Sequence, residues 1–533
     1  IAQCLVGSEM CIRDRNIHNV HLLLIGGLLF LLTGCMDLER EDFTEIYPDN
    51  FFKTETDLKL AVDGLYYDFG TGDWGGNGKA PSVFISDYNG YQTFSDMTTD
   101  VMWCNWGWQS DEYYFHQWTV TAGSVQSQFW NMFSHYNYLS KARNTIRRIE
   151  ESPVKEDIKK KYLGEAHALR GWMGLYLYDL FGPVPVASDD ILDNPETFVY
   201  LPRLTDEEYD AMMEEDLLNA IAMLPEMPEA RGRIAKGAAR MILLKYYMIR
   251  GHFEKAEALA RDLYAMEGNY TLQSDYSSIF SLAGAGNSEV ILQRPCNATL
   301  YGSENYLTAS FLPTDMLWTD KSTGWGGYVM AWDFYDTYEP GDKRLENMVF
   351  TSYVNTSGKT VTRTDMKYGA VTLKYGKDPG MTDAKSNVDI VVYRYSDVLL
   401  SLAELIVRNG GPISGEATRL VNRVRNRAGL GNLSAAQTAD TDAFLEAILL
   451  ERGHEFYCEG LRRQDLIRFG KYVEYANNRI NKINAEEGRG YYNVNDSHNR
   501  LPIPASFIDE SKSAIKQNPL YLSLIHISEP TRH

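Results

Sequence analysis

Apolar residues recur at intervals of three and four along several segments of the chain, and this spacing predicts amphipathic helices. In residues 54–69, Leu58, Ala61 and Leu65 share one face, and Thr54 is placed to cap the first turn. The other segments with this spacing are residues 127–152, 158–185, 235–266 and 393–430. The hydrophobic pattern therefore predicts a mainly α protein.

Glycine and proline interrupt two of these segments and divide each into a pair of helices. Residues 235–266 are broken at Gly251, and residues 393–430 are broken at Gly410-Gly411-Pro412. Two helices joined by a tight turn, with alanines at the packing points, are typical of tetratricopeptide units, although no strict repeat period holds here. We expect a tetratricopeptide-like helical-repeat scaffold.

Two long tracts between the helical segments, about 70–118 and 267–392, are rich in Gly, Tyr, Trp and Asp. Loops of this length in a compact protein are usually functional. We therefore expect the scaffold to carry a loop-rich second layer with a few short strands.

A short apolar run comes before the first helix. Residues 20–32 are apolar apart from His21, which suits the core of a signal peptide, whereas a membrane span needs about 20 apolar residues. The run ends in "LTGC", which resembles a bacterial lipobox, the motif whose cysteine takes the lipid. We expect a lipoprotein signal peptide over residues 16–34, lipidation at Cys35 and an acidic tether over residues 35–50; the alternative is a short buried helix with an incidental cysteine.

The two ends of the chain share an unusual feature. Residues 4–15 and 522–533 can both be encoded by one short DNA segment read on opposite strands, and that segment resembles a sequencing-library adapter. We expect residues 1–15 and 522–533 to be adapter-derived artefacts and leave them out of the fold prediction. The predicted helical domain then spans residues 51–521.

Charge and cysteine content narrow the possible partners. The chain has 52 Lys and Arg against 72 Asp and Glu, a net charge of −20, and an acidic chain is a poor ligand for nucleic acid phosphates. Outside the suspected artefacts and the lipidation site, Cys104, Cys296 and Cys458 lie far apart without metal-ligand spacing. We name no metal-ligating residues and expect no zinc site, no cofactor and no disulfide framework.

A series of motifs along the chain resembles one known family. In order they are "DNFFKTETDLKLAVDGLYYDF", "GEAHALRGWMGLYLYDLFGPVPV", "GRIAKGAARMILLKYYMIRGHFEKAEALA", "VVYRYSDVLLSLAELI" with "LVNRVRNRAGL", "ERGHEFYCEGLRRQDLIRFGKY" and "LPIPASFIDESKSAIKQNPLY". Together with the lipobox they resemble the SusD/RagB family of nutrient-binding outer-membrane lipoproteins. The chain departs from the family pattern at Gly171, Gly174 and Cys458; each helix-interior glycine costs about 1 kcal/mol.

The resemblance implies a function at the cell surface. Members of this family bind glycans or peptides and sit as a lid on a SusC-like TonB-dependent transporter. We therefore expect a lipid-anchored, surface-exposed outer-membrane protein that captures an oligosaccharide or polysaccharide and delivers it to such a transporter, with a peptide ligand as the alternative. The family resemblance also places the ligand site in the loop layer.

Aromatic residues gather in two places in that layer. A sugar ring offers apolar faces to aromatic rings and hydroxyl edges to carboxylates and amides. The candidate ligand-binding residues in the first tract are Asp100, Trp103, Asn105, Trp106, Trp108 and Tyr113, and those in the second are Trp325 and Tyr328, amid glycines that let a loop expose a ring. The alternative is that these aromatics form the core of the loops.

Charged residues in the scaffold motifs receive a structural interpretation. We expect Glu165, Arg170, Arg394, Asp397, Arg462 and Asp465 to satisfy buried polar groups or to pair with other charges.

Catalysis is a weaker hypothesis. Asp96, Asp100, Asp111 and Glu112 offer pairs of acidic residues, as a glycosidase needs, but most loops contain such pairs. "GGNGKA" at residues 75–80 lacks the full phosphate-loop pattern. A protein-docking role for the repeats is the third hypothesis.

Overall fold

The computed structural model describes residues 51–69, 90–106, 118, 120–122, 132–194, 196–300, 302–319, 324–519 and 521. The predicted leader, Cys35 and the predicted terminal artefacts lie outside these residues. Within the described part, every helix is too short or too polar to span a bilayer.

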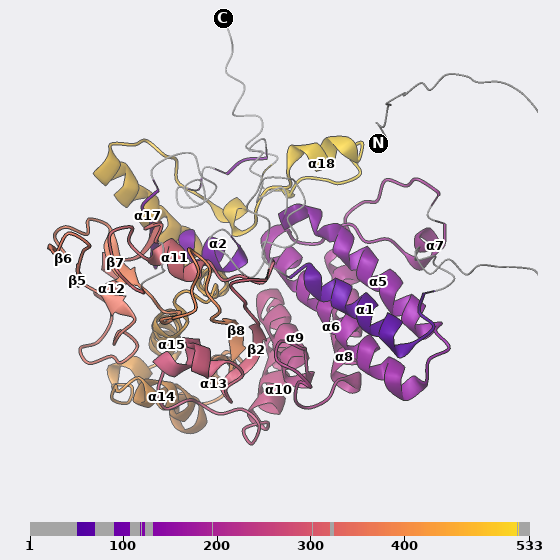
Figure 1. Cartoon of the computed structure of the whole chain (residues 1–533), viewed down its shortest axis with the longest axis horizontal. Coiled ribbons are helices and arrows are strands. Elements are labelled where there is room, and N and C mark those ends of the chain that lie inside the picture. Colours follow the sequence, from indigo (N-terminus) through magenta and orange to yellow (C-terminus); the bar gives the residue numbers. More distant parts are fainter. Residues whose placement is uncertain are drawn as a thin grey trace, which may run out of the picture. The chain divides into compact units, whose positions relative to one another are not determined.

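Helices make up about half of the described chain and the strands are few and short, which confirms the predicted mainly α fold (Figure 1). The longer helices are α1 (Glu55–Tyr67), α5 (Tyr136–Glu150), α6 (Glu156–Phe181), α8 (Asp206–Met223), α9 (Lys236–Arg250), α10 (Phe253–Tyr264), α13 (Tyr395–Arg408), α14 (Thr418–Arg427), α15 (Thr441–Phe456) and α17 (Tyr472–Glu487). The shorter ones are α2 (Tyr91–Met97), α7 (Asp189–Leu192), α11 (Leu307–Phe311), α12 (Trp332–Tyr335), α16 (Arg462–Arg468) and α18 (Ala505–Glu510).

Local signals set the helix ends where the sequence predicted them. The side chain of Thr54 accepts a hydrogen bond from the Asp57 amide at 3.3 Å, and the Asp57 carboxylate accepts one from the Thr54 amide at 2.8 Å, so α1 begins with a capping box. Gly251 ends α9 with a φ of 73°, a left-handed conformation that glycine adopts without strain. The break at residues 410–412 likewise separates α13 from α14.

Successive helices pack against each other and form the scaffold. Contacts join α5 to α6, α6 to α8, α8 to α9, α9 to α10, α10 to α13 and α13 to α14, so neighbours in sequence are mostly neighbours in space. Figure 1 shows α5, α6, α8, α9 and α10 side by side. Helix α8 was absent from the sequence prediction, although Tyr209, Met213, Leu217 and Ala220 form its buried stripe at helical spacing.

Two glycines that departed from the family pattern have a packing role. A Cβ atom at Gly171 would lie 2.6 Å from both Cγ and Cδ2 of Leu217, and one at Gly174 would lie 2.6 Å from Sδ of Met213. Leu217 and Met213 are fully buried on α8, so neither side chain has room to move aside. The absence of side chains at these positions lets α8 approach α6 closely.

Short strands form the second layer, as predicted for residues 267–392. The main sheet has the order β1-β3-β7-β4, and β2 pairs with β8 and β5 with β6, all antiparallel. The strands are β1 (Met102–Cys104), β2 (Val290–Arg294), β3 (Tyr328–Ala331), β4 (Val349–Phe350), β5 (Ser352–Val354), β6 (Thr360–Thr362), β7 (Gly369–Thr372) and β8 (Ile390–Arg394). The predicted domain boundaries stay a prediction.

Replacing Gly171 with alanine tests the close approach of α6 and α8. We expect Gly171→Ala to lower the free energy of unfolding by about 1–2 kcal/mol, because the clash with Leu217 outweighs the better helix propensity of alanine. Gly64 in α1 is the matched control: apart from its chain neighbours and the backbone of its own helix, no atom lies within 4 Å of the place a Cβ would take. Gly64→Ala should raise stability by up to about 1 kcal/mol. Equal effects of the two substitutions in urea denaturation would contradict the packing role.

Candidate functional site

The two aromatic tracts that were predicted to bind ligand lie next to each other. Strand β1 from the first tract pairs antiparallel with β3 from the second, with Met102 opposite Met330 and Cys104 opposite Tyr328. Beyond the strand end the pairing continues, because the amide of Asn105 donates to the carbonyl of Gly327 at 2.7 Å. The long-range pairing therefore builds one site from two segments far apart in sequence.

Three rings gather at this junction, and we call Trp106, Tyr306 and Trp325 the aromatic platform. The indole Nε1 of Trp106 donates to the carbonyl oxygen of Trp325 at 3.2 Å. The Trp325 ring stacks on the Tyr306 ring with centroids 5.7 Å apart and an interplanar angle of 18°. All three side chains are half-buried, so each keeps part of its surface open to solvent. The arrangement offers apolar ring surface to a ligand.

Polar groups and glycines frame the platform. Asn105 is exposed, and its Nδ2 donates to the carbonyl of Gly326 at 3.2 Å, which fixes the amide beside the rings. A Cβ atom at Gly327 would collide with the Trp106 ring, and Gly326 has a positive φ of 61°. The glycines of the second tract thus let the loop backbone pass directly against Trp106.

Other predicted ligand residues lie in the protein interior. The Trp103 side chain is 1% exposed and is covered by Tyr368, stacked at 4.7 Å between centroids, and by the Arg479 guanidinium, 4.9 Å from the ring centroid. Tyr328 is fully buried in β3. Since a stacking platform needs an open ring face, their burial argues against direct ligand contact. Trp108 and Tyr113 lie outside the described residues.

Asp100 also has a structural partner. Its carboxylate oxygens accept hydrogen bonds from Nε and Nη2 of Arg462 at 2.9 and 2.8 Å, a two-pronged ion pair between the first tract and α16. Both oxygens are therefore engaged, although ligand contact by Asp100 stays a prediction.

Tyr306 is a platform residue that the sequence analysis does not predict. It stands apart from the clustered aromatic residues by which the two tracts were identified.

The structural interpretation of the scaffold charges is confirmed, because each one forms an ion pair. The pairs are Glu165 with Arg233 at 2.9 Å, Arg170 with Asp216 at 2.9 Å, Arg394 with Glu459 at 2.7 Å, Asp397 with Arg452 at 2.8 Å, Arg462 with Asp100 at 2.8 Å, and Asp465 with Arg452 at 2.8 Å. Cys104, Cys296 and Cys458 are buried, and none of these three is part of a disulfide. The described residues contain no cluster of three or more His, Cys, Asp or Glu suited to a metal ion.

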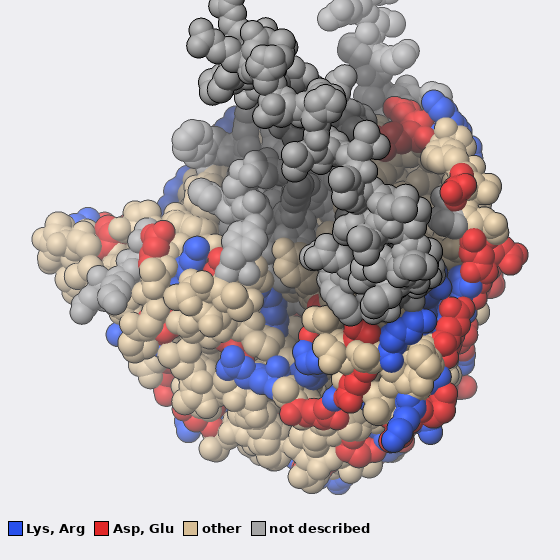
Figure 2. All heavy atoms as spheres, turned by 45° about the vertical axis from the view of Figure 1, so that its right-hand side comes forward, with Lys and Arg blue, Asp and Glu red and all other residues tan. Residues whose placement is uncertain are grey.

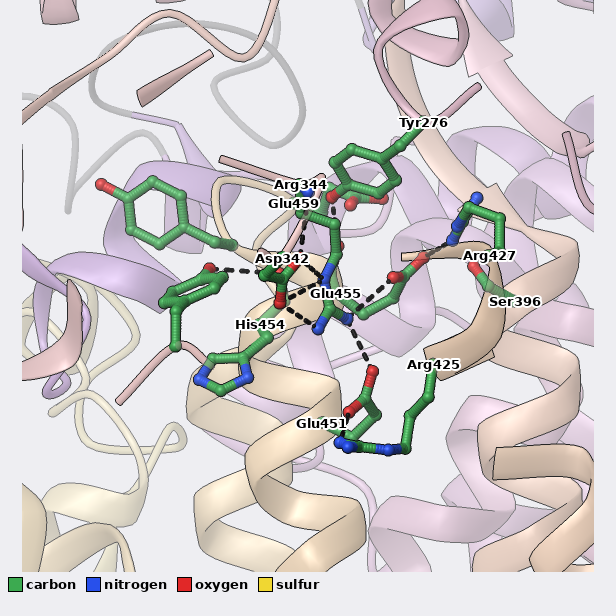
Figure 3. Close-up of polar contacts among 12 residues, drawn as sticks. Tyr276, Asp342, Arg344, Ser396, Arg425, Arg427, Glu451, His454, Glu455 and Glu459 are labelled. Carbon is green, nitrogen blue, oxygen red and sulfur yellow. Dashed lines mark hydrogen bonds and ion pairs between the residues drawn. The ribbon is translucent and has the colours of Figure 1, made fainter. Parts of the chain in front are cut away.

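A larger set of buried charges joins the second layer to the scaffold, and we call it the ion network (Figure 3). At its centre Glu455 of α15 pairs with Arg344, Arg394 and Arg427. The other members are Glu289, Asp342, Lys374, Arg425, Glu451 and Glu459. Burial alone would raise the pKa of Glu455, but the three arginines outweigh burial and hold the pKa well below its usual range.

Asp96 is a different kind of buried carboxyl group. It is fully buried and forms no hydrogen bond of ordinary geometry with the described residues, although the N–H groups of Cys458, Gly460 and Arg462 approach it. Burial raises the pKa of Asp96 to about 7, against the opposing effect of Lys374 and these N–H groups. Of the predicted acidic set, Asp96 is therefore buried and Asp100 is paired with Arg462.

The fold and the platform together define the class of the protein: a helical-repeat scaffold that presents aromatic side chains from a loop layer. Residues 347–521 match the family described as "SusD family", and residues 78–248 match the one described as "Starch-binding associating with outer membrane". The chain belongs to the SusD/RagB family.

Individual relatives agree with this assignment. SusD-like protein P2 of Formosa agariphila is 24% identical over 525 residues, which cover 93% of this chain and 98% of the relative. Starch-binding protein SusD of Bacteroides thetaiotaomicron is 32% identical over 138 residues, which cover 25% of this chain and 22% of the relative.

Solved structures share the fold. Surface glycan-binding protein A from Bacteroides thetaiotaomicron, solved in complex with laminarihexaose, has a TM-score of 0.70 at 21% identity, covering 87% of this chain and 99% of that one. A SusD homolog from the same organism has a TM-score of 0.73 at 21% identity, covering 89% and 99%.

The raised pKa of Asp96 predicts a pH-dependent stability difference. Its ordinary value is 3.8 and its folded value about 7, so between these pH values the folded state holds the proton that the unfolded state has released. The stability of the wild type relative to Asp96→Asn should therefore fall as pH rises from about 4 to 7, by up to about 1.4 kcal/mol per pH unit. Urea denaturation of both proteins across this range measures the difference; a difference independent of pH would contradict the assignment.

Proposed function

We propose that this protein is a glycan-binding protein of the outer membrane and that the aromatic platform is its ligand site. The observation that carries the proposal is the meeting of Trp106, Tyr306 and Trp325 at the junction of β1 and β3. Half-buried rings beside an exposed amide match the two surfaces of a sugar, its apolar C–H faces and its hydroxyl edges.

Family membership and charge support the same proposal. One matching family is described as starch-binding, and a solved structure with the same fold was obtained with laminarihexaose. The net charge of −20 disfavours nucleic acid as a partner. Figure 2 shows acidic and basic side chains interspersed among the described residues of the face it draws, a pattern unlike the basic stripe of a nucleic-acid-binding surface.

Removing a platform ring should weaken glycan binding. Trp106→Ala and Trp325→Ala should each cost about 1–3 kcal/mol of binding free energy, the scale of ring stacking, in calorimetry with laminarin, starch or mannan oligosaccharides. Phe198→Ala is the matched control because Phe198 is 78% exposed between α7 and α8 of the helical scaffold, and it should leave affinity unchanged.

Three results would contradict the glycan proposal. Equal affinity of the wild type and both tryptophan variants would place the ligand elsewhere. A melting-curve shift with peptides and with no polysaccharide would favour the peptide alternative. Accumulation of reducing ends during incubation of the purified protein with polysaccharide would make it an enzyme, whereas the binding proposal predicts a constant number of reducing ends.

We further propose that acyl chains on Cys35 anchor the protein at the cell surface and that it delivers its glycan to a SusC-like TonB-dependent transporter. The lipobox-like "LTGC" and the family described as associating with the outer membrane support this proposal. Several acyl chains anchor a protein stably, and tethering raises its effective concentration at a membrane transporter.

Removing the predicted lipidation site tests the anchor. Cys35→Ala should move the protein from the membrane fraction to the soluble fraction with an unchanged melting curve, because Cys35 lies outside the folded domain predicted for residues 51–521. Retention of Cys35→Ala in membranes would contradict lipid anchoring. Capture of the wild type from detergent-solubilised membranes should bring down a TonB-dependent transporter, and its absence would contradict the delivery role.

A further inference from the structure

A cavity of about 280 Å³ opens beside β1, between α12, α16 and α17. Its charged lining consists of Arg462, Arg479 and Lys482, which are basic, and Asp100 and Asp333, which are acidic. We call it the basic cavity, because its lining carries one more positive than negative charge. It is separate from the aromatic platform, since none of the three platform rings lines it.

Two of the three basic groups already have carboxylate partners. Arg462 holds Asp100 through both carboxylate oxygens, at 2.8 and 2.9 Å. The ammonium group of Lys482 lies 2.6 Å from Oδ2 of Asp333 at the exposed rim of the cavity. These pairs leave Arg479 as the source of the excess positive charge.

Arg479 differs from the arginines of the ion network. It is 6% exposed, donates from Nη2 to the backbone carbonyl of Asp100 at 2.7 Å and lies over the Trp103 ring. Among the described residues no carboxylate forms an ion pair with Arg479, and its Nη1, which is itself buried, has no hydrogen-bond acceptor. Burial lowers the pKa of Arg479 to about 10, so the guanidinium stays protonated at neutral pH.

A buried guanidinium with an unused donor is costly unless an anion pairs with it. The planar fork of arginine matches the oxygens of carboxylate and sulfate groups. A cavity of this volume admits such a group together with the ring that carries it. The electrostatics of the cavity therefore select a ligand with a compact oxyanion.

The basic cavity and the platform lie at opposite ends of one short segment. Asp100 lines the cavity and Trp106 belongs to the platform, and the six peptide units between them span no more than about 22 Å when fully extended. The two places are therefore no farther apart than the length of a short oligosaccharide.

We propose that the basic cavity binds the carboxylate or sulfate group of an acidic glycan, with Arg479 as its main partner, while neighbouring sugar rings rest on the aromatic platform. This inference rests on the proposed glycan-binding function and narrows its substrate class to acidic glycans. The carboxylate would come from a uronic acid and the sulfate from a sulfate ester.

Monosaccharide probes test the cavity separately from the platform. Calorimetry at constant ionic strength should show that glucuronate, glucose 6-sulfate or both bind the wild type at least tenfold more tightly than glucose. Binding of one anion but not the other would identify the group as a carboxylate or as a sulfate. Equal affinity for all three sugars would overturn the proposal.

Substitutions test whether Arg479 binds the anionic group of the sugar. Arg479→Gln should abolish the preference for the anionic sugar, and Lys482→Gln at the rim should reduce it several-fold without the risk of unfolding the interior. The matched control is Arg143→Gln, because Arg143 pairs with Asp189 on a distant part of the scaffold, and it should leave the preference intact. A preference that survives both cavity substitutions would overturn the proposal.

The platform variant separates this inference from the proposed function. Trp106→Ala should leave the binding of the anionic monosaccharides unchanged while it weakens the binding of neutral oligosaccharides. If neutral glycans bind through Trp106 but Arg479→Gln has no effect, the acidic-glycan inference fails and the glycan-binding proposal stands. If no oligosaccharide binds, the glycan-binding proposal itself fails.

Discussion

The buried ion pairs around Glu455 are the constraint on which the arrangement of this protein depends. Glu455 projects from scaffold helix α15, and the arginines that pair with it come from α14, from the end of β8 and from the loop before β4. A buried carboxylate needs all its partners in place, because a missing one leaves an uncompensated charge in the interior. The network therefore specifies how the strand-containing layer sits on the helices.

The geometry of the candidate site depends on this attachment of the strand layer to the helices. Lys374 lies just beyond the end of β7 and pairs with Glu459 at 2.6 Å, so the end of β7 is tied to the scaffold. Strand β7 pairs with β3, and β3 pairs with β1, whose flanking residues bring Trp325 and Trp106 together. On the other side of β1, Asp100 is held by Arg462 of α16. The platform rings thus lie on loops whose anchor points are charged and buried.

Local sequence signals predicted much of the scaffold but only part of the site. Helical spacing, the Thr54 cap and Gly251 gave helix positions that agree with the structure, because these signals act within a few residues. The apolar residues of α8 have the same spacing, but the sequence analysis does not predict this helix. The pairing of β1 with β3 joins residues more than 200 positions apart, and no local pattern encodes it. For the same reason composition alone did not separate the buried Trp103 from the half-buried Trp106, although they stand three residues apart.

Hydrogen exchange of Arg344→Gln tests the central claim, that the ion network holds the strand layer on the scaffold. Arg344 links the loop before β4 to Glu451 at 2.6 Å and to Glu455 at 3.2 Å, and both glutamates keep other arginine partners when it is removed. The account predicts that amides of β3, β4 and β7 lose protection while those of α6, α8 and α9 keep it. Unchanged protection of the strands, or an equal loss in both layers, would contradict it.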